Sequence, residues 1–344
     1  MSAGDQNEME AIAARLVAAI VVHYGDPRRT IRAVRSHWEL GVFSDIVIVS
    51  NDLTGRPPEL EDIPCTWLVP SRNLGFGGAC QLGAKTCSAD VYAFFNVHTT
   101  IDRVSVDYCR SAFDVQDVGI VAPCVYQPSR KNSATNWRYA RCTRRYSRVL
   151  RLPVQVPAKT GWADSYVSRA DLIDNEWATG AAIFCRKEVV RDVRWDDSYF
   201  LGYEDVDISM RAKMCGWRVV SVPSAVALHA GGSTRTLAAA SYYCMRNAVL
   251  FARRYRSRRI QAMLTAYLLT LLCRVAAADV LKRRRPPHLI PAARGMADGW
   301  LSRPSSAEGL PGRPVLSGGD SASVISGDQT GHAPMCPEAR RSRG

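Results

Sequence analysis

The sequence predicts an α/β fold in which a mostly parallel sheet is flanked by helices. Apolar runs of strand length recur from Leu16 to Leu228, residues at helical spacing separate them, and polar or glycine-rich residues follow them. Runs that are apolar at every position are typical of strands covered on both faces. Strands that alternate with helices favour parallel pairing. Together these observations define the expected fold class.

Each expected element has its own signal. Pro27 can start a helix because its φ is already helical, and apolar residues follow it at helical spacing. A further helix is expected from about 104 to 113, and another begins at Glu204 and closes at Gly216. The basic region from 127 to 175 shows neither period, so we expect a loop or an insertion over one face of the sheet. Buried strands are expected at residues 16–24, 45–50, 65–69, 91–97, 119–125, 178–185 and 218–228.

An apolar helix with arginines on both sides is expected at residues 260–281. Its apolar residues follow an i, i+3, i+4, i+7 spacing, but Arg274 and Asp279 interrupt the run. These charges argue against a helix that spans a membrane. Two interpretations stay open. The preferred one is an amphipathic helix that lies on an anionic membrane surface, and the other is an ordinary helix packed on the main domain.

The chain divides into three parts. The α/β domain is expected at residues 15–255. A helical extension, which could associate with a membrane, is expected at residues 256–302. Residues 303–344 are rich in Pro, Gly, Ser and Arg and poor in large apolar side chains. Such a composition cannot bury enough surface to offset the entropy of ordering, so this tail is expected to be disordered.

Composition limits the classes of function. The 344 residues carry a net charge of +13 and eleven cysteines, which form no C-x-x-C pair. Without a secretory signal at the N-terminus, this pattern favours free thiols in a reducing cytoplasm. The basic clusters at 130–151, 246–259 and 282–285 attract phosphates, nucleic acid or anionic lipid. Nucleic acid is not expected as a partner, because no reading helix or aromatic stacking platform is recognisable.

An acidic segment, Trp195–Asp207, is the most informative stretch of the chain. Carboxylates rarely occur among apolar groups unless they form ion pairs, cap a helix or take part in function, and this segment carries several of them. Glu204 and Asp205 open the predicted helix, whose dipole keeps a carboxylate ionised. A carboxylate of this kind can act as a general base. The alternative is that Asp205 only caps the helix.

Polar residues follow the first four predicted strands. In a doubly wound sheet, ligands bind outside the carboxyl ends of the strands. Glycines after the third strand would let the backbone approach a ligand and offer unpaired amides to phosphate oxygens. The alternative is a set of ordinary strand-to-loop exits. The residues are His23, Tyr24 and Asp26, then Ser50 and Asn51, then Arg72, Asn73 and Gly75, and finally Asn96 and His98.

The order of these segments resembles family 2 glycosyltransferases with the GT-A fold, and most of all the bacterial rhamnosyltransferase branch. Each motif is modest alone, but the ordered set, from about Val17 to Arg254, is specific. The matching residues are Val21-Val22-His23-Tyr24, Val49-Ser50-Asn51, Asn73-Leu74-Gly75-Phe76-Gly77-Gly78, Asn96-Val97-His98, Ala178-Thr179-Gly180-Ala181, Asp197-Ser198-Tyr199-Phe200, Glu204-Asp205-Val206-Asp207, His229-Ala230-Gly231-Gly232-Ser233 and Tyr242-Tyr243 with Arg246-Asn247.

The resemblance implies an inverting transfer of a sugar from a nucleotide-diphosphate donor to a hydroxyl of a glycan or lipid-linked acceptor. Rhamnose is the sugar suggested by the branch, and cell-wall or polysaccharide synthesis at the inner face of the cell membrane is the expected setting. Asp205 becomes the expected base, and Glu204 shapes the acceptor site. The nucleotide-sugar pocket would be lined by His23, Tyr24, Asp26, Ser50, Asn51, Arg72, Asn73, Gly75, Asn96 and His98. Trp177, Thr179, Gly180 and Asp197 would border the sugar or the acceptor.

One departure from the family concerns the cation. The family holds a divalent cation with acidic residues where this chain has Asn96-Val97-His98. Three outcomes stay open. Mn²⁺ could be bound through His98 and His229. Mg²⁺ is the other candidate, although it is less suited to imidazole ligands. Arg72 and Arg235 could stabilise the diphosphate without metal. Activity could also be lost, which would leave a non-catalytic nucleotide-sugar or glycan-binding relative. A neutral His98, hydrogen-bonded at a strand end, is the alternative to a metal ligand.

Overall fold

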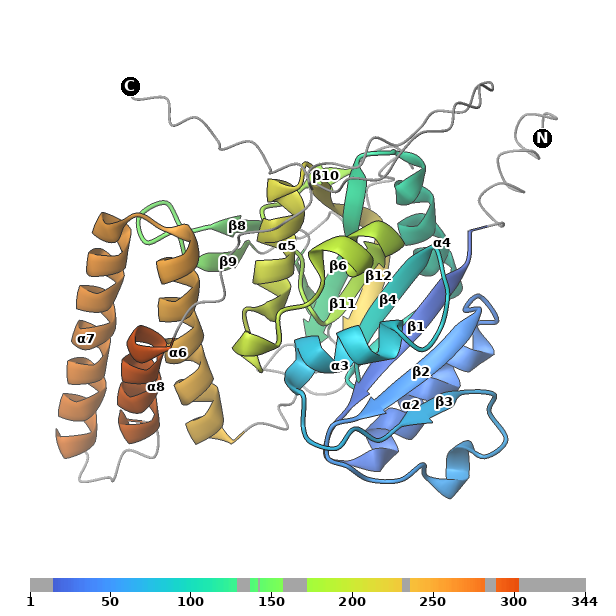
Figure 1. The fold of residues 1–344 in the computed structure, drawn as a ribbon, viewed down its shortest axis with the longest axis horizontal. Helices are drawn as coiled ribbons and strands as arrows, with labels where there is room; N and C mark the ends of the chain where they lie inside the picture. Colours follow the sequence, from blue (N-terminus) through green and yellow to red (C-terminus); the bar gives the residue numbers. More distant parts are fainter. Residues whose placement is uncertain are drawn as a thin grey trace, which may run out of the picture.

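A computed structural model describes residues 15–128, 137–141, 143–156, 172–230, 236–281 and 289–302. Its centre is a large sheet with the strand order β10-β12-β6-β11-β4-β1-β2-β3. Helices cover both faces of the sheet, and three C-terminal helices stand beside it (Figure 1). The expected α/β class, with a central sheet, flanking helices and a C-terminal helical extension, is therefore confirmed, and the sheet combines parallel and antiparallel pairs.

One half of the sheet is purely parallel. Its strands are β1 (Val17–His23), β2 (Asp45–Ser50), β3 (Thr66–Leu68) and β4 (Val91–Asn96). Helix α2 (Pro27–Glu39) connects β1 to β2, and α3 (Gly75–Ala84) connects β3 to β4. Because these strands share one direction, their carboxyl ends lie along one edge of the sheet.

The other half is mixed. Strand β11 (Ala182–Arg186) runs antiparallel between β4 and β6 (Val118–Pro128), and β12 (Arg218–His229) runs parallel to β6. The short strand β5 (Thr99–Ile101) pairs antiparallel with the end of β12, opposite His229. Helix α4 (Arg103–Ser111) follows β5. This pairing brings the segment after β4 next to the end of β12.

The expectation of an irregular region at 127–175 is wrong for its described parts. They contain β7 (Trp137–Arg141), β8 (Thr143–Tyr146), β9 (Pro153–Val156) and β10 (Ile173–Asp174). Strands β7 and β10 extend the main sheet, whereas β8 and β9 form a separate antiparallel pair. Strands this short hold too few residues to show a period of two in the sequence.

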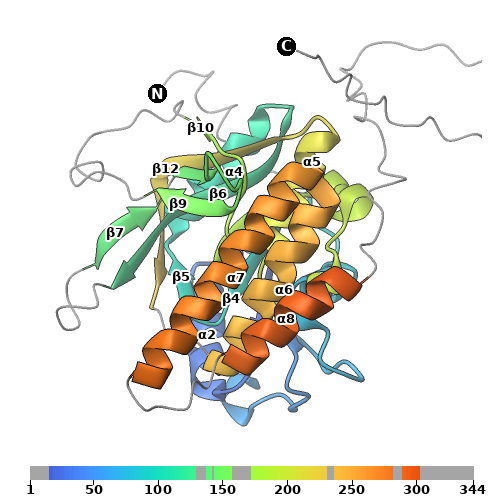
Figure 2. The ribbon, with the colours of Figure 1, turned by 90° about the vertical axis from the view of Figure 1, so that its left-hand side faces the viewer.

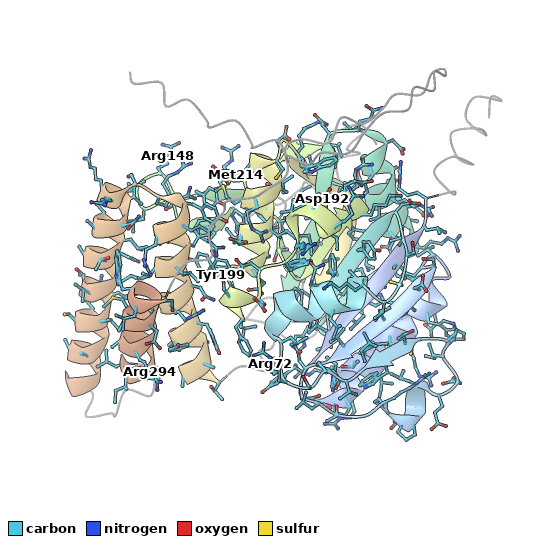
Figure 3. The ribbon with its side chains drawn as sticks, in the orientation of Figure 1. Arg72, Arg148, Asp192, Tyr199, Met214 and Arg294 are labelled. Carbon is cyan, nitrogen blue, oxygen red and sulfur yellow. The ribbon has the colours of Figure 1, made fainter. Side chains whose placement is uncertain are left out.

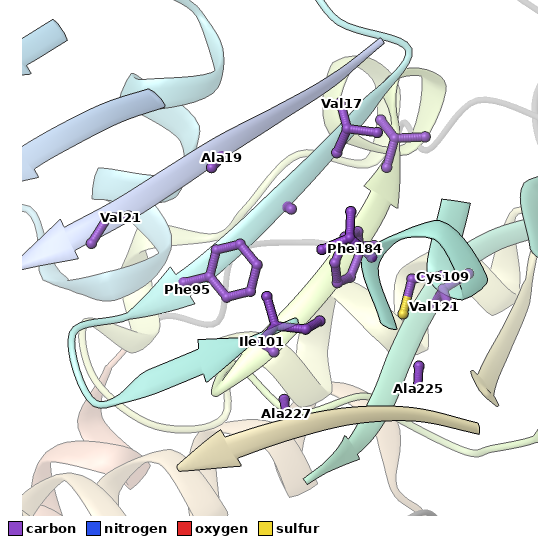
Figure 4. Close-up of a cluster of buried hydrophobic side chains, with 14 of the residues drawn as sticks. Val17, Ala19, Val21, Phe95, Ile101, Cys109, Val121, Phe184, Ala225 and Ala227 are labelled. Carbon is purple, nitrogen blue, oxygen red and sulfur yellow. The ribbon is translucent and has the colours of Figure 1, made fainter. Parts of the chain in front are cut away.

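Alternate residues of the central strand β1 enter different cores. Val17, Ala19 and Val21 face the layer of α2 and α4, where Figure 4 shows them with Phe95 and other strand residues. Their neighbours in β1 face the layer of α3 and α5 (Glu204–Met214). Full burial of such side chains is worth about 1.5–3 kcal/mol each. A strand covered on both faces must be apolar throughout, which explains its sequence.

The C-terminal helices form a layer beside α5. They are α6 (Leu237–Tyr255), α7 (Arg258–Leu281) and α8 (Leu289–Leu301), and Figure 2 shows them side by side. Leu264, Leu268 and Leu272 of α7 are buried in a shared core with residues of α6 and α8. The inner face of α7 therefore packs against protein. Within the described ranges, no helix combines the length and apolarity needed to cross a bilayer.

The cysteines differ in part from the expectation of free thiols, and the expected disordered tail is outside the part of the chain that the structure describes. Cys124 is disulfide-bonded, which departs from the expectation of free thiols throughout. The expected disordered tail at 303–344 and Arg235 lie outside the described residues. Among the described residues, the free thiols are Cys65, Cys80, Cys87, Cys109, Cys185, Cys215, Cys244 and Cys273.

Candidate active site

A cavity of about 610 Å³ lies at the carboxyl ends of the parallel strands, between them and α6. Its volume is within the range of about 300–1,000 Å³ that is usual for small-molecule sites. Much of the expected site meets in this one cavity. The expected residues that line it are Tyr24, Asn51, Asn73, Gly75, Asn96, His98, Thr179, Gly180, Glu204, Asp205 and His229.

Two expected nucleotide contacts are instead part of a hydrogen-bond cluster at the ends of β1 and β2. His23 is fully buried, and its two ring nitrogens lie 2.6 Å from Thr30 Oγ1 and 3.2 Å from Thr54 Oγ1. Burial lowers the pKa of His23, although Asp52 acts in the opposite direction. The buried Ser50 hydroxyl donates to Asp52 Oδ1 over 3.0 Å. These side chains hold the ends of β1 and β2 and do not line the cavity.

Four other expected residues also lie outside the cavity lining. Asp26 caps α2 through the amide of Arg28, and Arg72 is exposed just before α3 (Figure 3). Trp177 is buried, and its indole Nε1 donates to the carbonyl of Arg145 over 3.2 Å. Asp197 is exposed in the 3₁₀ helix η4 (Asp197–Tyr199). A segment can thus reach the site while some of its side chains turn away from it.

Asp205 is a cavity residue rather than a helix cap. Tyr203 occupies the N-cap of α5 in a left-handed conformation, with no side-chain cap. The two carboxylate oxygens of Asp205 accept hydrogen bonds from the amides of Gly180 and Val206, each over 2.8 Å. Desolvation raises the pKa of Asp205, and the backbone amides oppose this shift. The carboxylate is therefore oriented at the cavity wall and is more basic than an exposed aspartate.

A buried acidic side chain fixes the helix that carries Asp205. Asp207 is fully buried and accepts hydrogen bonds from Arg211 Nε at 2.6 Å, Arg254 Nη1 at 2.7 Å and Tyr255 Oη at 2.6 Å. Arg254 and Tyr255 belong to α6, so this network joins α5 to α6. The third carboxylate of the acidic motif is consequently structural.

The turn before α5 is strained. Phe200 has a φ of 60°, and the amide of Leu201 donates to the carbonyl of Tyr199 over 2.6 Å, which closes a γ-turn with a positive φ at its centre. Tyr203 follows with a φ of 75°. Such conformations cost on the order of 1–3 kcal/mol each and persist only when the surroundings hold them.

Asn247 of α6 holds this turn. It is fully buried, and its amide nitrogen donates to the carbonyls of Tyr199 at 2.9 Å, Leu201 at 3.1 Å and Gly202 at 2.6 Å. Asn247 belongs to a motif that carried the family resemblance, but its sequence position alone predicts no role for it. We therefore identify it as a positioning residue for the start of α5.

The glycine-rich loop docks on the same turn. Gly75 has a φ of 71°, and a Cβ there would lie 2.2 Å from the carbonyl oxygen of Phe200. The amide of Phe76 donates to that oxygen over 2.9 Å. Asn51 fixes the loop from the other side, because its Nδ2 donates to the carbonyl of Gly75 over 2.8 Å. Only glycine allows this close approach.

His98 lies in the tight turn between β4 and β5. The Asn96 side chain accepts from the His98 amide at 3.0 Å and from Thr99 Oγ1 at 2.8 Å. His98 Nδ1 lies 3.1 Å from Arg29 Nη1. An arginine can only donate, so Nδ1 accepts and the proton of the neutral ring sits on Nε2. Burial, followed by the charges of Arg29 and His229, lowers the pKa of His98 to about 4.

The residues around His98 do not fit a divalent cation. The rings of His98 and His229 are 5.9 Å apart. Nevertheless, the described parts of the chain contain no group of three or more His, Cys, Asp or Glu residues that could hold a metal ion. One nitrogen of His98 accepts from Arg29 and the other carries a proton, so neither offers a free lone pair to Mn²⁺ or Mg²⁺. The expected metal ligands His98 and His229 thus lie together without forming a metal site.

Aromatic residues that were not expected complete the cavity. Phe76, Phe200 and Tyr243 line it, and the rings of Phe200 and Tyr243 stack with centroids 5.2 Å apart. All three occur in segments that carried the family resemblance. That resemblance was the available signal, but it does not say which side chains face the cavity.

Comparisons with solved structures agree with this architecture, whereas comparisons of the sequence found no match. No family model matches the sequence. No curated protein matches it. Among solved structures, the chain is similar to the mannosyltransferase PcManGT from Pyrobaculum calidifontis in complex with GDP-Man and Mn²⁺, with 13% identity, 83% of this chain and 86% of that chain covered, and a TM-score of 0.50.

A second similar structure is GalNAc-T7 with UDP, GalNAc and Mn²⁺. It shares 12% identity and a TM-score of 0.51, over 68% of this chain and 51% of that chain, so the present chain spans about half the length of GalNAc-T7. These likenesses show the fold alone: the chain has a GT-A type α/β fold. Sequence identities this low do not show that the chain belongs to the rhamnosyltransferase branch, so its membership of that branch stays a prediction.

Proposed function

We propose that this chain is an inverting glycosyltransferase that moves a sugar from a nucleoside-diphosphate donor to a hydroxyl group. The observation that carries the proposal is the Asp205 carboxylate, held by two backbone amides at the wall of the strand-end cavity. The fold supports it, because the two similar structures contain UDP or GDP-Man in a GT-A fold. Rhamnose stays the sugar that the sequence resemblance favours.

The chemistry follows from the position of Asp205. The acceptor oxygen attacks the anomeric carbon from the face opposite the diphosphate, and Asp205 takes the hydroxyl proton as the new C–O bond forms. The bond between the anomeric carbon and the diphosphate oxygen breaks, and the nucleoside diphosphate leaves with the electron pair. Attack from the opposite face inverts the configuration.

The remaining lining residues suggest how substrates are divided within the cavity. Tyr24, Asn51 and Asn73 lie at the ends of β1 to β3, where we place the nucleotide. Thr179 and Gly180 lie beside Asp205, where we place the transferred sugar or the acceptor. Glu204, buried next to Asp205, borders the same region.

Substitution of Asp205 by Asn tests the proposal. Transfer is assayed with uracil, guanine and thymine nucleotide sugars, rhamnose among the sugars, with water or a glycan as the acceptor. The variant should lose turnover by about 10²–10⁴-fold while binding of nucleoside diphosphate persists. Asp197→Asn is the matched control, because Asp197 is an exposed carboxylate in the same acidic segment.

Two outcomes would decide against this mechanism. If Asp205→Asn turns over like the wild type, Asp205 is not the base. If the wild type binds a nucleotide sugar but transfers nothing to any acceptor, the protein is the non-catalytic binding relative. The poor fit for a divalent cation is the observation that favours this second candidate.

We further propose that the protein works at the anionic inner face of a membrane, on a lipid-linked acceptor. The outer face of α7 exposes Met263, Tyr267 and Leu269. No charged residue occurs in α7 between Arg259 and Arg274. An exposed apolar helix face with arginines at both ends complements an anionic lipid surface.

A further inference from the structure

The cavity presents an electrostatic problem for the proposed donor. Its described lining residues include the carboxylates of Glu204 and Asp205 and no lysine or arginine. Both phosphates of a nucleotide sugar are negatively charged, and like charges in a partly desolvated site repel strongly. Some cation must therefore face the diphosphate, and the residues present do not fit a divalent metal ion.

Arg29 is a cation that reaches the cavity wall. It lies in the first turn of α2, and its Nη1 is 3.1 Å from Nδ1 of the lining residue His98. Two other arginines of α2 are engaged elsewhere, since Arg28 pairs with Asp26 and Arg35 with Asp62. The described ion pairs do not include Arg29. Its guanidinium is exposed, so most of its donors remain accessible to a ligand.

His98 adds a second donor to the same wall. Because its Nδ1 accepts from Arg29, its Nε2 carries a hydrogen and can only donate. The pair thus presents guanidinium N–H groups and one imidazole N–H. This donor set suits phosphate oxygens, which accept hydrogen bonds, and does not suit a cation.

We propose that Arg29 and His98 together bind the diphosphate of the nucleotide-sugar donor, and that they do so without a divalent cation. This inference rests on the proposed function. Binding by fixed donors also assists the reaction, because negative charge grows on the diphosphate as its bond to the sugar breaks. The guanidinium and the imidazole N–H stabilise that charge without any proton transfer.

The test measures the binding of UDP, GDP and dTDP by isothermal titration calorimetry, once with EDTA and once with Mn²⁺. The wild type should bind its preferred nucleotide equally well in both, within about threefold. Arg29→Gln should weaken binding in EDTA by about tenfold or more, because it removes a charged hydrogen-bond donor. Arg32→Gln is the matched control, because Arg32 is exposed on the same helix and its substitution changes the net charge by the same amount.

A second variant separates the donor role of His98 from that of Arg29. His98→Phe keeps an aromatic ring at the cavity wall but removes the imidazole N–H, so it should also weaken binding in EDTA. Circular dichroism and the melting temperature report whether each variant is folded.

The outcomes separate this inference from the proposed function. Binding that needs Mn²⁺, or an Arg29→Gln variant that binds like Arg32→Gln, overturns the role of the Arg29–His98 pair and leaves sugar transfer standing. If no nucleoside diphosphate binds under either condition, the proposed function fails and this inference fails with it.

Discussion

Truncation of Asn247 to alanine should both destabilise the protein and slow the reaction. The Asn247 side chain is fully buried on α6 and donates to the carbonyls of Tyr199, Leu201 and Gly202. These carbonyls belong to the strained turn that leads into Glu204 and Asp205. Alanine would leave them without the amide donor and would release the turn.

The size of the effect follows from the geometry. One amide group has two hydrogens, so at most two of the three carbonyls receive a full hydrogen bond at any moment. A buried acceptor left unsatisfied costs about 1–3 kcal/mol. With two acceptors left unsatisfied, Asn247→Ala should therefore lower the free energy of unfolding by about 2–6 kcal/mol. A displacement of Asp205 on the order of 1 Å would lower kcat by about a hundredfold.

Urea unfolding followed by tryptophan fluorescence measures the first effect, and the transfer assay measures the second. Gln261→Ala is the control, because its amide gives only one half-buried hydrogen bond, to the carbonyl of Arg256 over 2.8 Å. It should cost about 1 kcal/mol or less and leave kcat unchanged. If Asn247→Ala behaved like this control in both assays, our account of the turn would be refuted.

Two further predictions concern pH and the membrane. Burial raises the pKa of Asp205 above the ordinary value of 3.8, and only the ionised form accepts a proton, so kcat/KM should fall about tenfold per unit as pH drops through the raised pKa. An acid limb centred at or below 3.8 in the pH profile would contradict this assignment. Tyr267→Glu should reduce co-sedimentation with vesicles of anionic phosphatidylglycerol, whereas Val104→Glu, an exposed apolar position on α4, should not. Self-association through α7 in size-exclusion chromatography would instead indicate that a second copy covers this face.

The sequence was most informative where burial constrains every residue. Strands β1, β2 and β4 were predicted nearly to the residue, because strands covered on both faces are apolar without interruption. The short strands between 137 and 174 escaped prediction. Strands β7 and β10 pair with strands of the main sheet, and β8 and β9 pair with each other, and a few residues cannot encode such partners.

The site was predicted at the level of segments and less well at the level of side chains. Within one short segment, Trp177 is buried and does not line the cavity, whereas Thr179 and Gly180 do. Similarly, His23 ends a buried strand and points into the protein, while Tyr24 reaches the cavity. A motif locates a segment along the chain, but backbone direction decides which side chains the cavity receives.

Asn247 and Arg29 show a different limit of the sequence. Asn247 contacts a turn that lies 45 to 48 residues before it, and Arg29 contacts His98 across 69 residues. Neither residue type is unusual at its own position on an amphipathic helix. Only the contact across the fold gives them a role, so local patterns could not reveal it.

The C-terminal helices belong to the machinery that holds the proposed base. Helix α8 packs so closely on α6 that a Cβ at Gly295 would lie 2.2 Å from the carbonyl oxygen of Tyr242. Helix α6 in turn holds the strained turn through Asn247 and the start of α5 through the ion pair of Arg254 with Asp207 at 2.7 Å. Strain in a turn persists only when several neighbours determine its shape together. Helix α7 packs on α6 and α8. A membrane surface bound to the outer face of α7 would therefore contact the layer of helices that positions Asp205.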